Sequence, residues 1–286
     1  SQSKKEHIVK KYNVGFIGYG NMSRAIVAAL KNPVSVKFLK NAGFKLNIAV
    51  SDNDANKLSD VPEGVKFTTD NQELISACDL IVLAVKPQNA AQAVDGLDFS
   101  GKIVMSIMAS VTIKALSELI NGKTDKIVRV MPNLNARIAS AYSAFCVKGL
   151  SGEEYGLVKA ILSTFGEADE LKEEQMNAAT GLSGSGPAFV FKFINALAEG
   201  GAENGLDKAQ ALKMALATVI GSAYLVESGE GGNDISELVK SVCSKGGTTI
   251  EGVKHLDENN FEKTVAQAVT KAVKRAEEMS KSNEKG

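Results

Sequence analysis

The chain has 286 residues, of which 44% are hydrophobic and 23% charged, a composition typical of a soluble globular protein with room for two domains. Its 33 basic and 33 acidic residues give zero formal net charge, so no basic field favours nucleic acid as a partner. Three distant cysteines and two histidines lack metal-ligand spacing, so we expect no metal. No apolar run approaches the roughly 20 residues that span a bilayer, and no secretory signal opens the chain. We therefore expect a cytoplasmic protein with reduced thiols and no membrane segment.

The first part of the chain alternates short apolar runs with helical stretches. Six apolar runs predict strands, at residues 14–17, 46–50, 79–85, 103–107, 127–130 and 144–147. Continuous apolar strands separated by helices are typical of a parallel sheet covered on both faces. The sequence therefore predicts an α/β fold that begins with a Rossmann-type parallel sheet, in a dinucleotide-binding domain over residues 12–172.

A glycine turn follows the first predicted strand and opens a helix. Gly18 permits the tight turn, and Gly20 lets the backbone approach a pyrophosphate that rests on the helix N-terminus. Ser23, a small residue, stands at the third position of the pattern. A glycine pattern alone is a weak signal, and an ordinary strand-to-helix turn is the alternative. Its place between strand and helix favours dinucleotide binding.

The end of the second predicted strand bears on the choice of cofactor. Asp52 or Asp54 could accept a hydrogen bond from a ribose 2′-hydroxyl, which favours NADH. Ser51 with nearby Lys57 would instead suit the 2′-phosphate of NADPH. Both aspartates could equally cap a helix. We expect NADPH or NADH, and the sequence leaves the preference open.

Two further segments follow predicted strands. Ligands of open parallel sheets lie outside the carboxyl ends of the strands. We therefore expect residues 85–87 and 108–110 to border the ribose and the nicotinamide. Lys86 is the only charged residue of these segments, and it could equally be a surface lysine.

After Glu173 the strand pattern disappears. Helical spacing predicts helices at 188–204, 208–228 and 262–279. Their many alanines and glycines let helix axes approach closely but give each helix little apolar area. We therefore expect an all-helical domain over residues 173–286 that completes its core against a second copy of the chain.

A Gly-Gly-Thr-Thr segment at 246–249 stands at the start of another predicted helix. The glycines allow several backbone N–H groups to point one way, and a helix N-terminus adds partial positive charge. These features predict a seat for a small anion such as a carboxylate. The hydroxyls of Ser244 and Thr248 could instead cap the helix.

These motifs, with Arg-Val-Met-Pro-Asn at 129–133 and Thr-Gly-Leu-Ser-Gly-Ser-Gly-Pro-Ala at 180–188, resemble those of the pyrroline-5-carboxylate reductases over nearly the whole chain. The resemblance implies reduction of Δ1-pyrroline-5-carboxylate to L-proline by NADPH or NADH, the last step of proline biosynthesis. It also implies an interlocked homodimer with a helical dimerisation domain, commonly assembled into a homodecamer. An interlocked dimer would let the 246–249 segment serve the cofactor of the neighbouring chain.

The motifs and the resemblance together imply the site residues. Thr249 corresponds to the threonine that hydrogen-bonds the ring nitrogen and is the expected catalytic residue. The residues expected to bind substrate are Glu173, Ser244, Gly246, Gly247, Thr248 and Thr249. Those expected to bind the cofactor are Gly18, Tyr19, Gly20, Asn21, Met22, Ser51, Asp52, Asn71, Ala84, Val85, Lys86, Pro87, Met108 and Ala109. The chain departs from the family at Lys245, usually proline, and at Ser110, commonly glycine, so loop geometry should differ there.

Other functions remain alternatives. A β-hydroxyacid dehydrogenase or another imine reductase shares the Rossmann-plus-helices plan, and Lys192 would match the catalytic lysine of such enzymes. The Gly-Ser-Gly-Pro sequence before that helix does not fit their pattern. A non-catalytic dinucleotide-sensing protein would keep the glycine turn and lose residues 246–249, which this chain retains. Ser183 and Ser185 have no histidine base in view, so a hydrolase fits poorly.

Overall fold

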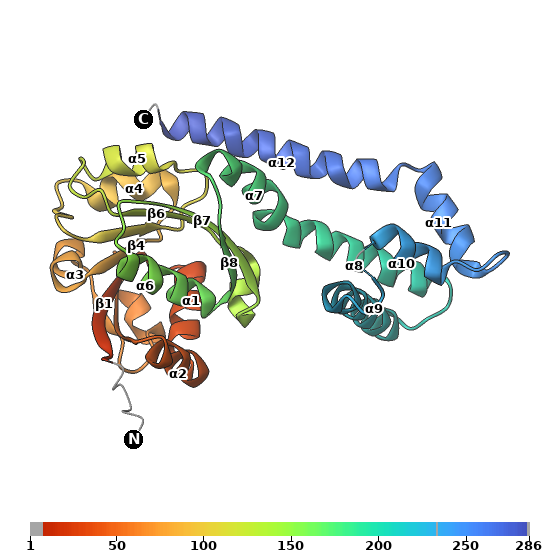
Figure 1. Cartoon of the computed structure of the whole chain (residues 1–286), viewed down its shortest axis with the longest axis horizontal. Helices are drawn as coiled ribbons and strands as arrows, with labels where there is room; N and C mark the ends of the chain where they lie inside the picture. Colours follow the sequence, from red (N-terminus) through yellow and green to blue (C-terminus); the bar gives the residue numbers. More distant parts are fainter. Residues whose placement is uncertain (1–7, 233, 285–286) are drawn as a thin grey trace, which may run out of the picture. The chain divides into compact units, whose positions relative to one another are not determined.

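The computed structural model describes residues 8–232 and 234–284, which form two units by their internal contacts (Figure 1). The first unit holds residues 8–184 and 272–284, and the second holds 185–271. The C-terminal part of the last helix thus groups with the sheet. The division predicted between residues 172 and 173 stays a prediction.

An eight-stranded sheet, in the order β3-β2-β1-β4-β5-β6-β7-β8, forms the first unit. The strands are β1 (Lys10–Ile17), β2 (Phe44–Ser51), β3 (Lys66–Thr68), β4 (Leu80–Leu83), β5 (Ile103–Ser106), β6 (Ile127–Met131), β7 (Ala141–Lys148) and β8 (Gly166–Glu170). The pairs are parallel except β6 with β7, which run antiparallel with Ile127 opposite Lys148. The predicted α/β class with a Rossmann-type parallel sheet is confirmed, and one reversed pair lies within this mainly parallel sheet.

Two strands were not predicted, and both lie at the edges of the sheet. β3 has three residues, and β8 reads Gly-Glu-Ala-Asp-Glu. A short or charged edge strand resists pairing with other chains. The same features leave no apolar pattern for sequence analysis to detect.

Helices cover both faces of the sheet, because alternate strand residues enter two separate cores. One core joins Phe16 and Val82 to α1 (Asn21–Lys31), α2 (Pro33–Asn41) and α6 (Gly152–Ser163). The other core joins strand residues such as Ile17 and Ile81 to three further helices. These are α3 (Asn71–Ala77), α4 (Pro87–Val94) and α5 (Ile113–Leu119). The carboxyl ends of β1, β2 and β4 are thereby held on a rigid scaffold.

Hydrogen bonds join the end of α12 (Phe261–Asn283) to the loop after β5. Asn283 Nδ2 donates to the Ser110 carbonyl oxygen at 3.0 Å, and Thr112 Oγ1 donates to Glu284 Oε1 at 3.0 Å. Ser110 has a left-handed backbone with φ of 60°, which costs a non-glycine residue about 1 kcal/mol. Its buried Oγ has no hydrogen-bond partner among the described residues.

Replacing Ser110 by glycine should therefore stabilise the protein, by about 1 kcal/mol, because it relieves the left-handed strain and removes the unpaired hydroxyl. The free energy of unfolding in urea, compared at one protein concentration, measures the change. Ser110→Ala keeps the strained Cβ and removes only the hydroxyl, so it should stabilise less. A glycine variant less stable than the wild type would contradict this account.

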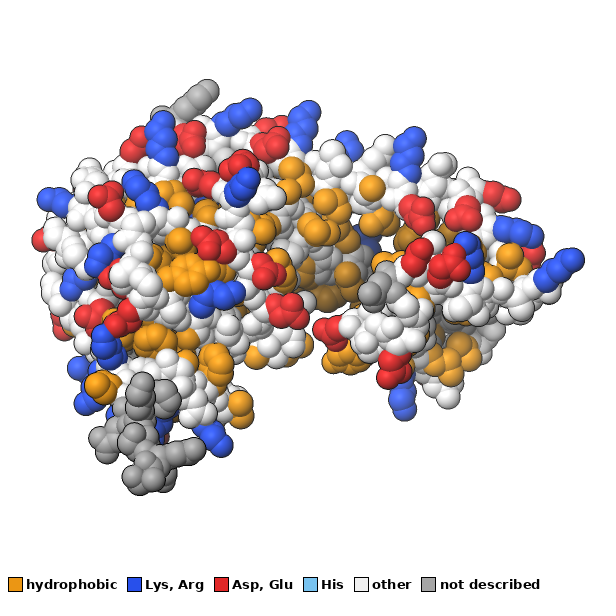
Figure 2. Space-filling model, in the orientation of Figure 1, with side chains coloured by type: hydrophobic (Ala, Val, Ile, Leu, Met, Phe, Trp, Pro, Cys, Tyr) orange, Lys and Arg blue, Asp and Glu red, His pale blue; other side chains and the backbone are white. Residues whose placement is uncertain are grey.

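The second unit is helical. It contains α8 (Gly186–Glu203), α9 (Lys208–Ser228), α10 (Ile235–Val242), α11 (Thr248–Glu258) and the first part of α12. The helices predicted at 188–204, 208–228 and 262–279 are confirmed. Many large apolar side chains of this unit are exposed, such as Phe191, Ile220 and Tyr224, at 51, 53 and 65%. Figure 2 shows apolar side chains at its surface.

α9 is long and apolar. By length and composition alone its 21 residues are apolar enough to cross a membrane, although Lys208, Lys213 and Glu227 interrupt the apolar run. Only 11% of its most apolar stretch is buried within the chain. An apolar helix that is exposed in one chain is also typical of an interface at which a second protein chain covers it.

Candidate active site

The glycine turn between β1 and α1 is shaped for a ligand. Gly18 has φ of 94°, and a Cβ there would lie 2.8 Å from the Ala84 carbonyl oxygen, so only glycine fits. Gly20 directly precedes α1, and a Cβ on it would meet nothing within 4 Å. No described side chain caps this helix, whose first N–H groups are therefore open to an anion.

A cavity of about 570 Å³ opens at this turn. It lies at the carboxyl ends of β1, β2 and β4 and along α4, where the open-sheet rule places ligands. Of the predicted cofactor residues, it is lined by Gly18, Tyr19, Gly20, Asp52, Asn71, Ala84, Val85 and Lys86. Asn53, Lys57, Asn89 and Gln92 also line it, and sequence analysis did not assign Asn53, Asn89 or Gln92 to the site.

The other predicted cofactor residues lie outside the wall of this cavity. Asn21 and Met22 begin α1, and Pro87 begins α4. Met108 is buried in the second core, and Ala109 follows it in the loop after β5. Their contact with a cofactor stays a prediction.

Ser51 and Asp52 make different hydrogen bonds at the end of β2. Ser51 is fully buried, and its Oγ donates to Asn71 Oδ1 at 2.7 Å. The Asp52 carboxylate accepts hydrogen bonds from Lys57 Nζ at 2.8 Å and from the backbone N–H groups of Tyr19 at 2.9 Å and Asp54 at 3.0 Å. Asp52 thus ties the end of β2 to the glycine turn.

Asp54 takes the capping role that the sequence left open for either aspartate. Its carboxylate accepts from the Asn56 N–H at 3.0 Å at the start of the short helix Ala55–Asp60. Asp54 is not on the wall of the cavity, whereas Asp52 is.

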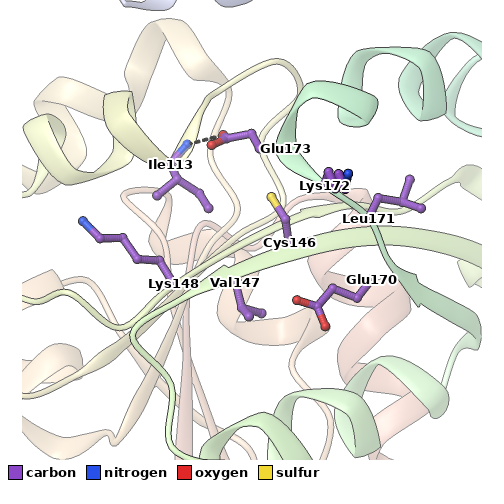
Figure 3. Close-up of a pocket in the computed structure, with 8 residues that line it drawn as sticks. All are labelled: Ile113, Cys146, Val147, Lys148, Glu170, Leu171, Lys172 and Glu173. Carbon is purple, nitrogen blue, oxygen red and sulfur yellow. Dashed lines mark hydrogen bonds between the residues drawn. The ribbon is translucent and has the colours of Figure 1, made fainter.

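Glu173 forms a pair that sequence analysis missed. Its Oε1 accepts from the Ile113 N–H at 2.7 Å (Figure 3). The same oxygen accepts from Arg129 Nη1 at 3.2 Å. The Arg129 side chain is only 4% exposed, so it needs a nearby counterion. Glu173 therefore holds α5 and β6 together, and its contact with substrate stays a prediction.

Replacing Glu173 by alanine should lower the free energy of unfolding by about 1–3 kcal/mol, because Arg129 would remain buried without its partner. The loss should stay below that of a fully buried pair, since Glu173 is 37% exposed. Chemical unfolding measures it, and Glu174→Ala, at the exposed neighbouring carboxylate, is the control. Restored stability in Glu173→Leu with Arg129→Met would support the pairing, and equal losses at 173 and 174 would contradict it.

The Gly-Gly-Thr-Thr segment begins α11 as predicted. Gly246 has φ of 70°, and Gly247 is the residue before the helix. A Cβ on Gly247 would overlap the Ser244 hydroxyl, so the Ser244 side chain would have to rotate to admit any larger residue. Thr248 and Thr249 are the first two helical residues. No described side chain caps α11, so the alternative of capping by Ser244 or Thr248 is not observed.

The motif at 129–133 meets residues 180–184 of the other motif in the first unit, whereas residues 185–188 belong to the second unit. Asn133 Nδ2 donates to the Ser183 carbonyl oxygen at 3.2 Å, and a Cβ on Gly184 would approach Met131 Cε to 2.5 Å. The end of the flexible Met131 side chain would have to move aside to admit that Cβ. Ser183 Oγ donates to the Ala179 carbonyl oxygen at 3.0 Å, as a helical serine does.

The expected absence of a metal stays a prediction. Within residues 8–232 and 234–284, no three His, Cys, Asp or Glu side chains gather as a possible metal site. His7, one of the two histidines, lies outside the described residues.

The turn at Gly18 and Gly20, called the glycine cradle from here on, opens onto a cavity at the edge of a Rossmann-type sheet. Together these features define an NAD(P)H-dependent oxidoreductase. Residues 173–279 match the family model for pyrroline-5-carboxylate reductase dimerisation, and residues 13–110 match the model for coenzyme F420-dependent NADP oxidoreductase. The chain belongs to the pyrroline-5-carboxylate reductase family.

Relatives match along almost the full length. The chain is 39% identical to the pyrroline-5-carboxylate reductase of Aquifex aeolicus, over 95% of this chain and 99% of that one. It is 35% identical to the Escherichia coli enzyme, over 94% of this chain and 98% of that one. The Plasmodium falciparum pyrroline carboxylate reductase with NADP bound has a TM-score of 0.80 at 28% identity, covering 94% of this chain and 98% of that one.

Proposed function

We propose that this protein reduces Δ1-pyrroline-5-carboxylate to L-proline with NADPH or NADH. Full-length similarity to pyrroline-5-carboxylate reductases places it in that class of oxidoreductase. The observation that carries the assignment in this chain is the cradle at Gly18 and Gly20, which opens onto a cavity, together with the match of residues 173–279 to the dimerisation family model. The alternatives of a β-hydroxyacid dehydrogenase and a non-catalytic sensor lack such support. A reductive aminase from Aspergillus terreus shares only the fold, with a TM-score of 0.57 at 14% identity.

The residues of the cavity fit a dinucleotide. Gly20 leaves its backbone accessible, and the uncapped N-terminus of α1 offers N–H groups to a pyrophosphate. Lys86 adds a positive charge at the end of β4. NAD(P)H, when bound, supplies the hydride, and the protein's task is to bind and orient the reactants.

The substrate has two groups that the protein can bind, a carboxylate and a ring nitrogen. We infer that the backbone N–H groups of residues 247–249 hold the carboxylate, since they stand at an uncapped helix N-terminus. The Thr249 hydroxyl then holds the ring nitrogen. Binding of both groups presents one face of the ring for reduction. Orientation of this kind lowers the activation barrier by up to roughly 7–11 kcal/mol. Among the described residues no metal cluster competes with this assignment.

The protein is a homo-oligomer, as its dimerisation sequence at 173–279 indicates. We further propose an interlocked dimer assembled into a decamer. The exposed apolar side chains of α8 and α9 support this, because a second copy would cover them. A monomer at low concentration in light scattering would contradict the dimer.

We also propose a cytoplasmic location. Cys78 and Cys146 are buried free thiols. Burial is the largest cause that raises the pKa of Cys78 to about 11 and that of Cys146 to about 12. Such protonated thiols resist oxidation, which suits structural cysteines of a reducing compartment.

The enzymatic test measures oxidation of NADH and of NADPH, side by side, with and without Δ1-pyrroline-5-carboxylate. We expect oxidation with at least one of the two cofactors that requires the imine and yields an equal amount of proline. Cofactor binding without imine-dependent oxidation would reject the reductase assignment.

A further inference from the structure

We propose that Asp52 determines cofactor specificity and makes NADH the preferred cofactor of this chain, an inference that rests on the proposed binding of NAD(P)H at the glycine cradle. The adenosine ribose of a dinucleotide lies at the end of the second strand of such a sheet. Asp52 is the residue of the cavity wall at that position, directly after β2.

The carboxylate is fixed in place by three contacts. Oδ2 accepts from Lys57 Nζ at 2.8 Å and from the Tyr19 N–H at 2.9 Å, and Oδ1 accepts from the Asp54 N–H at 3.0 Å. Tyr19 lies between the two cradle glycines, so the carboxylate cannot turn away without releasing the phosphate-binding turn. A carboxylate offers about four acceptor sites, and these three bonds leave one for a ribose hydroxyl.

Asp52 carries a negative charge at neutral pH. Burial by itself raises the pKa of this carboxyl, but the bonds from Lys57, Tyr19 and Asp54 and the charge of Lys57 together hold the pKa below its ordinary value. A 2′-hydroxyl can donate to this charged oxygen. A 2′-phosphate, which is acceptor-only when fully ionised, would face it with a charge of the same sign.

The cations nearby do not offset this repulsion. Lys57 is paired with Asp52, and reaching for a phosphate would leave a carboxylate that is only 8% exposed without its counterion. Arg24 is paired with Asp60 at 2.7 Å and lies over the Tyr19 ring. Lys86 lies after β4, at another strand end of the cavity. The small hydroxyl that could serve a phosphate, Ser51, already donates to Asn71.

The test is the ratio of cofactor affinities, measured on the whole oligomer by calorimetric titration with NADH and NADPH. The wild type should bind NADH at least about tenfold more tightly than NADPH. Asp52→Asn keeps the size and an acceptor for the Tyr19 N–H but removes the charge and frees Lys57. It should shift the ratio toward NADPH by about tenfold or more. Adding Lys57→Met should remove that gain.

Asp54→Asn is the matched control, because it removes the same charge two residues away and off the cavity wall. Its ratio should stay near the wild-type value. Equal or tighter binding of NADPH by the wild type, or an Asp52→Asn variant that weakens both cofactors equally, would overturn the inference. A wild type that prefers NADPH would overturn the inference even if the Asp52→Asn variant fails to fold. Binding needs no imine, so a chain that binds NADH but does not reduce the substrate refutes the reductase assignment alone.

Discussion

Replacing Gly18 by alanine should weaken the binding of both NADH and NADPH by about a hundredfold, equivalent to about 2.7 kcal/mol. The backbone at Gly18 has φ of 94°, which a residue with a Cβ adopts only with strain. The added Cβ would also lie 2.8 Å from the Ala84 carbonyl oxygen, which is a rigid backbone atom at the end of β4. The turn must shift to make room, and the cradle loses its shape.

Gly96→Ala is the control for backbone strain. Gly96 also has a left-handed φ of 69°, but a Cβ on it would meet nothing within 4 Å, and it does not line the cofactor cavity. This variant should lose stability and keep its affinity for both cofactors. A Gly18→Ala protein that is folded by circular dichroism and binds with wild-type affinity would remove the glycine turn from the site.

Replacing Thr249 by alanine should lower turnover by about ten- to a hundredfold, or about 1.4–2.7 kcal/mol. The substitution deletes the hydroxyl proposed to hold the ring nitrogen, while Thr249 remains the second residue of α11 and alanine is a good helix former. The loss should appear in steady-state rates with the imine, and titration should show unchanged cofactor affinity, because the glycine cradle is untouched.

Thr249→Ser separates the hydroxyl from the shape of the side chain. Serine retains the donor and acceptor, so this variant should recover most of the lost turnover. Thr249→Val keeps the shape without the hydroxyl and should resemble alanine. Full activity in the alanine or valine variant would remove Thr249 from the mechanism.

The sequence predicted the central strands because each is a continuous apolar run buried on both faces. The reversal at β7 was missed, since an apolar run carries no direction. A usable signal did exist in the length of the connection. Only residues 132–140 separate β6 from β7, which is shorter than the roughly 10–12 residues that a parallel crossover requires.

The candidate site likewise has some features that the sequence can predict and others that it cannot. Gly18, Gly20 and the start of α11 were predictable because each depends on a few adjacent residues. The pairing of Arg129 with Glu173 was not, because the two are 44 residues apart and only folding brings them together. The signal available was a charge inside the apolar run Ile-Val-Arg-Val-Met, since a buried guanidinium requires a counterion.

Transfer of isotope tests the assigned reaction most directly. The protein is mixed with Δ1-pyrroline-5-carboxylate and the better-bound cofactor carrying deuterium at the transferring position, and the product is identified by mass spectrometry and NMR. We expect L-proline with a single deuterium on the former imine carbon, in an amount equal to the cofactor oxidised. Proline without deuterium, or cofactor that binds but is not oxidised, would contradict the assignment.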